Sequence, residues 1–161
     1  MRGRALIQGP QRPNKERNDA AIALFEQALN VAPNEPDVLA NLALAYARNN
    51  SWKWAGANED YSPKLISLTN RALELDPNNV TAYVALAYHM DLSGRPNDIL
   101  RAANAGLAID RYSAALYAAR SFAEGQIGQY AENISDQKRA KELNRYDPEV
   151  LWWASPKGLA R

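Results

Sequence analysis

The sequence predicts an all-α protein, an α-solenoid built from antiparallel helix pairs. Similar segments end at Pro77, Arg111 and Arg145, which are 34 residues apart (111 − 77 = 145 − 111 = 34). A related segment ends at Pro33, 44 residues before Pro77, so the first gap is ten residues longer. Between these ends, apolar residues recur at spacings of three and four, which is typical of amphipathic helices. A 34-residue period with helical patterning indicates a helical repeat array.

Proline and capping residues locate the individual helices. Pro36, Pro63 and Pro148 suit a first helical turn, where the missing N–H is not needed. The N-cap candidates, whose side chains can accept a hydrogen bond from a free backbone N–H, are Ser62, Asn79, Ser113 and Asp147. Residues 1–8 are expected to be the last turns of a first helix. The further helices are predicted at residues 15–32, 36–50, 62–76, 79–93, 96–110, 113–127, 129–145 and 148–154.

Aligned on the period, the repeats agree in several columns at once. Turn glycines stand at Gly94 and Gly128. One column holds only small residues, namely Ala28, Ala72, Gly106 and Ala140. A second column holds large residues, namely Leu39, Tyr83, Tyr117 and Leu151. We expect the small column to mark the place where the two helices of each repeat cross closely.

These columns resemble the tetratricopeptide repeat (TPR), in which a large residue, a Leu-small pair, an aromatic residue, a turn glycine, a small residue and a proline follow in order. The resemblance extends from about Asn18 to Asp147, although Arg111 and Arg145 replace the expected proline. It implies a right-handed superhelix in which the first helix of each repeat lines the concave side. It also implies a protein or peptide as the partner.

We interpret residues 1–161 as a single TPR domain. It is divided into a partial unit at residues 1–33, repeats at 36–77, 80–111 and 114–145, and a capping or truncated helix at 148–154. The opening RGRALI and the later AIALFEQAL look like the TPR region of bacterial multidomain proteins that carry a nucleotide cyclase or winged-helix domain. Neither a cyclase nor a DNA-binding motif occurs in this sequence.

Composition and motifs argue against several classes of function. The net charge of +1 argues against a nucleic-acid partner, and no apolar run approaches the ~18 residues of a membrane span. Without a signal sequence, the expected location is cytoplasmic. There is no cysteine and a single histidine, His89, so no metal site is expected. Because no catalytic or cofactor-binding motif occurs, we expect neither an enzyme nor a cofactor.

The candidate binding residues lie in the predicted first helices. Leu44, Tyr88 and Phe122 form one apolar column, and we expect Tyr88 to be a binding hot spot, provided one face of its ring is open to the groove. The alternative is that these side chains are buried between neighbouring first helices. The full candidate set is Asn41, Leu44, Arg48, Val84, Tyr88, Leu92, Phe122 and Gln126.

Two other features invite a functional or a structural interpretation. The insert at residues 51–60 carries Trp52 and Trp54, which either anchor the loop on the domain or form a binding surface. In the third repeat, four positions that are apolar or small earlier in the chain become polar. These positions are Arg120, Glu124, Asn133 and Gln137. They suggest either a patch that determines binding specificity or a looser terminal repeat.

The expected function is therefore a non-catalytic scaffold that binds a peptide or protein segment in an apolar concave groove. The alternative is a regulatory or oligomerisation segment of a larger signalling enzyme or transcription regulator, whose groove would hold another domain of the same chain. Trp152 and Trp153 bear on this choice, because they either fold back onto the array or mark its continuation. The sequence leaves the oligomeric state open.

Overall fold

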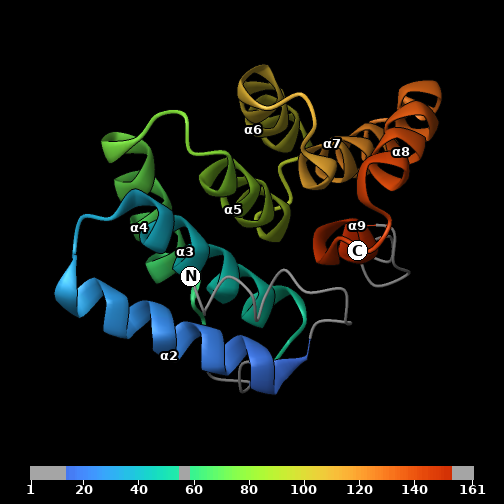
Figure 1. The fold of residues 1–161 in the computed structure, drawn as a ribbon. Helices are drawn as coiled ribbons and strands as arrows, with labels where there is room; N and C mark the ends of the chain where they lie inside the picture. Colours follow the sequence, from blue (N-terminus) through green and yellow to red (C-terminus); the bar gives the residue numbers. More distant parts are fainter. Residues whose placement is uncertain (1–13, 55–58, 154–161) are drawn as a thin grey trace.

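The computed structural model describes residues 14–54 and 59–153, so the helix expected at residues 1–8 lies outside the described part. Within these ranges every regular element is an α-helix (Figure 1). None of these helices combines the length and apolarity needed to cross a bilayer. The helices are α2 (Lys15–Val31), α3 (Pro36–Ser51), α4 (Ser62–Leu75), α5 (Val80–Leu92), α6 (Pro96–Ile109), α7 (Ala114–Gln126), α8 (Tyr130–Asn144) and α9 (Pro148–Trp153).

Three of the four predicted N-caps form. The Asn79 side chain accepts a hydrogen bond from the Ala82 N–H, and Ser113 caps α7 in the same way. Asp147 Oδ1 accepts from the Glu149 N–H at 2.8 Å. The prediction for Ser62 is wrong, because α4 begins at Ser62 itself. The Asp60 carboxylate accepts the Ser62 N–H at 2.9 Å, which makes the serine the first helical residue.

The helices pack as sequential antiparallel pairs, as the sequence predicts (Figure 1). The small-residue column explains part of this packing. A Cβ added at Gly106 of α6 would lie 2.4 Å from Leu116 Cδ1 and 3.0 Å from Tyr83 Cβ. Only a residue without a side chain lets α6 approach α5 and α7 this closely. Ala72 and Ala140 in the same column are also buried.

A single large core cluster runs through most of the array, from Ala21 in α2 to Trp153 in α9. The first helices of the repeats, α3, α5 and α7, form the inner side of the arc, and α9 lies within it beside α7 (Figure 1). The chain thus returns to its own inner side after the third repeat. This return positions the candidate site.

The third pair, α7 and α8, is joined by polar contacts. Arg120 Nε lies 2.5 Å from Asp136 Oδ2, and its Nη1 donates to Asn104 at 2.9 Å. The Asn133 amide donates to the Ser121 carbonyl at 2.6 Å. Glu124 is buried, and its Oε2 atom has no hydrogen-bond partner. Of the four polar positions noted in the third repeat, Arg120 and Asn133 thus make hydrogen bonds between α7 and α8, and Arg120 also reaches Asn104 of α6.

Candidate functional site

We define the inner face as the side of the array formed by Leu44 and Arg48 of α3, Val84 and Tyr88 of α5, and Phe122 of α7. All five side chains are buried. The array brings them together, but they do not form one continuous open groove. The helix α9 packs against Arg48, Tyr88 and Phe122, while Leu44 and Val84 line a cavity beside it. The helix α9 is six residues long, and its capping residue Asp147 orients it as it leaves α8.

The contact between α9 and the inner face is centred on one carboxylate. Arg48 Nε donates to Glu149 Oε1 at 2.9 Å, and Arg48 Nη2 donates to the same oxygen. The Tyr88 hydroxyl donates to the other oxygen, Oε2. Arg48 and Glu149 are 101 residues apart in the chain. Donors from two inner helices therefore meet one side-chain carboxylate of α9.

This polar contact lies out of solvent. The side chains of Arg48 and Glu149 are 3% and 5% exposed, so the two opposite charges offset one another within a buried ion pair. Burial, with Glu149 beside it, raises the pKa of Tyr88 well above its ordinary value, so the hydroxyl stays protonated and donates. Charge-assisted hydrogen bonds of this kind are stronger than neutral ones and define a specific geometry.

Aromatic rings form the second part of the contact. Trp153 packs between Tyr88 and Phe122, with ring centroids 4.9 Å from each. Trp152 lies 4.8 Å from Trp52 and 6.3 Å from Tyr88, measured between centroids. Both tryptophans of α9 are nearly inaccessible, at 1% and 3% exposure. The inner face therefore accommodates two large indole rings beside a carboxylate.

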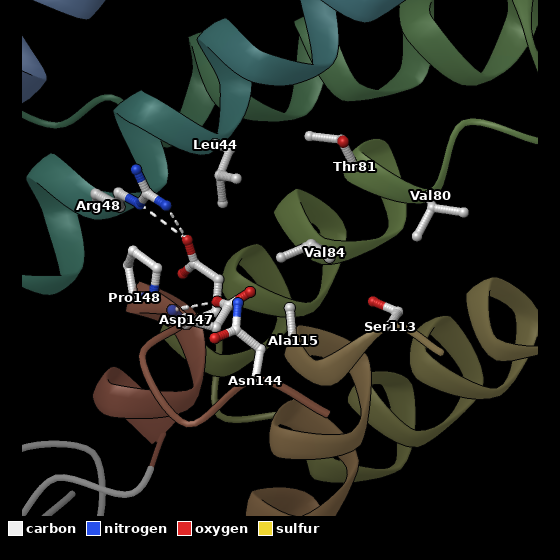
Figure 2. Close-up of a pocket in the computed structure, with 11 residues that line it drawn as sticks. Leu44, Arg48, Val80, Thr81, Val84, Ser113, Ala115, Asn144, Asp147 and Pro148 are labelled. Atoms are coloured by element: carbon white, nitrogen blue, oxygen red, sulfur yellow. Dashed lines mark hydrogen bonds and ion pairs between the residues drawn. The ribbon is translucent and has the colours of Figure 1, made fainter. Parts of the chain in front are cut away.

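A cavity of about 300 Å³ remains next to this contact, where α9 does not fill the space between the inner helices (Figure 2). Arg48, Asp147 and Glu149 are the charged residues that line it. Burial, followed by the neighbouring Glu149, raises the pKa of Asp147 to about 6. The other lining residues are Leu44, Val80, Thr81, Val84, Ser113, Ala115, Asn144 and Pro148.

The remaining candidate residues stand apart from this contact. Asn41 is buried, and its amide donates to the Asp37 carbonyl within its own helix at 2.7 Å. Leu92 is half-buried at the end of α5, and Gln126 is exposed at the end of α7. Their role in binding stays a prediction. The condition of an open ring face on Tyr88 is not met, since the side chain is 0% exposed beside the two tryptophans, as in the buried alternative.

The tryptophans of the insert pack on the domain. Trp52 is half-buried against Trp152, and Trp54 stacks on Trp52 with the ring centroids 5.4 Å apart. Residues 55–58 of the insert lie outside the described part. The anchoring interpretation thus has direct contacts in its favour, and Trp52 also extends the aromatic surface that receives α9.

Sequence reasoning missed Glu149 as a partner of the inner face, and it left open whether Trp152 and Trp153 fold back onto the array, as they do. A signal was present, because two adjacent tryptophans follow a well-capped helix start and are unsuited to a polar end cap. The repeat period cannot show where such a helix docks, since it reports only contacts between neighbours. In residues 14–54 and 59–153, no group of three or more His, Cys, Asp or Glu side chains is placed to hold a metal ion.

No protein-family model matches the sequence, and no curated protein matches it. Solved structures do match. A crystal structure of MamA gives a TM-score of 0.58 at 17% identity, covering 89% of this chain and 81% of that one. A MamA structure from AMB-1 gives 0.54 at 22%, covering 79% and 69%. The thermophilic TPR protein TTC0263 of Thermus thermophilus gives 0.54 at 19%, covering 89% and 92%. These identities show a shared fold alone, an all-α array similar to TPR proteins.

Proposed function

We propose that this chain is a non-catalytic protein–protein interaction scaffold whose inner face binds a peptide or protein segment. The observation that carries the proposal is the seating of α9. A six-residue helix is too short to be stable by itself, so contacts with the inner face hold it in place. The face thereby accommodates a short segment through an ion pair, a hydroxyl donor and aromatic packing. These are the interactions that binding hot spots commonly use.

The same observation favours a second candidate, a regulatory segment of a larger signalling protein. In that case the inner face holds part of its own chain, and its partner is intramolecular. The similarity of the opening residues to bacterial multidomain regulators agrees with this candidate. The two candidates differ in whether a separate protein competes with α9.

Site-specific photo-crosslinking in cells tests the proposal. A photo-reactive amino acid at Thr81, which lines the cavity beside α9, reports contacts at the inner face. The matched control places the same amino acid at Ile134, which is 67% exposed on α8. We expect one separate protein to crosslink at position 81 and not at position 134, and to bind the purified chain.

Crosslinks that form equally at both positions, or only at position 134, would contradict binding at the inner face. Crosslinks from position 81 confined to other parts of the same polypeptide would support the regulatory candidate instead. Binding of the crosslinked protein to the purified chain is then measured again with Arg48→Ala, which removes the central hydrogen-bond donor from the inner face. A partner of the inner face loses affinity for this variant, provided circular dichroism shows that it remains helical.

A further inference from the structure

All residues of α9 except Leu151 are buried. Glu149, Val150, Trp152 and Trp153 are 3%, 3%, 1% and 3% exposed, whereas Leu151 is 38% exposed, and the polar and aromatic contacts with the inner face come from Glu149, Trp152 and Trp153. Residues three and four apart lie on the same side of a helix, so the carboxylate and both indoles point together at the inner face. The segment that docks therefore has a simple pattern, an acidic residue followed three and four positions later by tryptophan.

The inner face is complementary to this pattern. Arg48 is a buried cation, and the Tyr88 hydroxyl donates beside it, so a ligand without an acceptor would leave both groups without Glu149 as their partner. Such a loss is costly for a buried charge. Next to these donors, Tyr88 and Phe122 provide aromatic surface for one indole, and Trp52 for the other. The chemistry of the face thus selects an acidic, aromatic ligand.

We propose that the external partner of this face presents the same pattern, a helical turn with Glu or Asp followed three and four residues later by large aromatic side chains. In this proposal α9 is an intramolecular copy of the ligand and competes with the partner. The inference rests on the proposed function, because it names the partner of the same face. A tethered segment acts at a high effective concentration, so it weakens the apparent affinity for any separate ligand.

A labelled peptide with the sequence of residues 144–153 tests this inference in the full chain. Its binding is measured by fluorescence anisotropy with the wild-type chain and with W152A/W153A, whose own α9 can no longer fill the two indole sites. We expect the variant to bind the peptide at least tenfold more tightly than the wild type. A second chain, E149Q, keeps both indoles and is expected to bind the peptide more tightly than the wild type, by a smaller factor.

The peptide itself is varied to test each half of the pattern. Peptides carrying E149Q, or alanine at both tryptophans, are expected to lose at least tenfold in affinity for the W152A/W153A chain. A peptide carrying L151A is the matched control, because that side chain points away from the inner face, and its affinity is expected to stay within twofold. Circular dichroism establishes that each chain is folded.

Three results would overturn the inference: equal affinity of wild-type and variant chains, equal affinity of all the peptides, or a wild-type dimer that the peptide dissociates. The last would assign α9 to a neighbouring copy. Failure of this inference can be distinguished from failure of the proposed function. If the protein crosslinked at position 81 lacks the acidic-aromatic pattern but still requires Arg48, the scaffold role stands and this inference falls.

Discussion

Two arginine–carboxylate pairs in this protein use the same chemistry in different surroundings. Arg48 and Glu149 connect α3 to α9, and their side chains are 3% and 5% exposed. Arg120 and Asp136 connect α7 to α8, and theirs are 25% and 11% exposed. The first pair is buried where α9 packs on the inner face, while the second lies between α7 and α8 and is partly exposed. From this difference in burial we expect the stability of the fold to depend more strongly on the first pair than on the second.

Replacing the buried arginine is expected to have the largest effect. Arg48→Ala leaves the Glu149 carboxylate buried without its counter-ion, which commonly costs about 3–5 kcal/mol of unfolding free energy. The matched variant, Arg120→Ala, removes a partner whose side chain is 25% exposed, and it is expected to cost less, about 1 kcal/mol. Urea unfolding followed by circular dichroism measures both. Equal losses in the two variants would show that the burial of the first pair is not as described.

Removing the Tyr88 hydroxyl tests the hydrogen bond that this uncharged side chain donates to Glu149. Tyr88→Phe keeps the ring between the tryptophans but takes one donor from Glu149, so we expect a loss of about 1–3 kcal/mol. Tyr130→Phe is the control, because Tyr130 is 68% exposed and its change is expected to stay within about 0.5 kcal/mol. If both variants unfold at the wild-type urea concentration, the bond from Tyr88 to Glu149 does not contribute to stability.

A pH titration sharpens the comparison on the α7–α8 side. Burial, followed by repulsion from Asp136, raises the pKa of Glu124 to about 7 from 4.5. The folded state therefore binds a proton that the unfolded state has released, so this residue lowers stability as the pH rises from about 4.5 to 7. Glu124→Gln should flatten the curve in this window and raise stability at pH 8 by on the order of 1 kcal/mol.

The Glu124→Gln experiment has two internal checks. Glu16→Gln changes an exposed residue on α2, which is not among the groups that shift the pKa of Glu124, and it is expected to leave the pH dependence as in the wild type. Asp147, whose pKa is raised to about 6, keeps a slope between about pH 4 and 6 in every variant. A Glu124→Gln curve that runs parallel to the wild-type curve above pH 6 would contradict the raised pKa of Glu124.

The smallest effect is expected on the outer surface of α8. Ile134 is 67% exposed, and Ile134→Ser should change the unfolding free energy by less than about 0.5 kcal/mol. Binding of the acidic-aromatic peptide should also stay unchanged. A large loss of stability would mean that the side chain is covered by another molecule in solution.

The fold could be predicted from the sequence largely because its determinants are local. Asn79 and Ser113 cap the helices that follow them, and Gly106 permits the close crossing that the small column predicts. The inner-face residues Leu44, Tyr88 and Phe122 could likewise be grouped from their spacing alone. A repeat places equivalent residues on the same side of successive helices, so a fixed period is enough to bring them together.

The docking of α9 could not be predicted in this way. It depends on a contact between residues 101 positions apart, and nothing in the period links Arg48 to Glu149. The pattern at Ser62 misled for a related reason, because the choice of cap depends on the Asp60 carboxylate two residues earlier. In each case a carboxylate that does not belong to the repeat pattern, Glu149 for Arg48 and Asp60 for Ser62, determines the local structure.

The most direct test of the central claim, that α9 lies on the inner face, is a nuclear Overhauser measurement on the isotope-labelled chain. The ring centroids of Trp153 lie 4.9 Å from those of Tyr88 and Phe122, so cross-peaks between ring protons are expected for both pairs. The indole protons of Trp152 and Trp153 should exchange slowly with solvent, since both side chains are buried. The absence of these cross-peaks in a folded chain, together with rapid exchange of both indole protons, would contradict the claim.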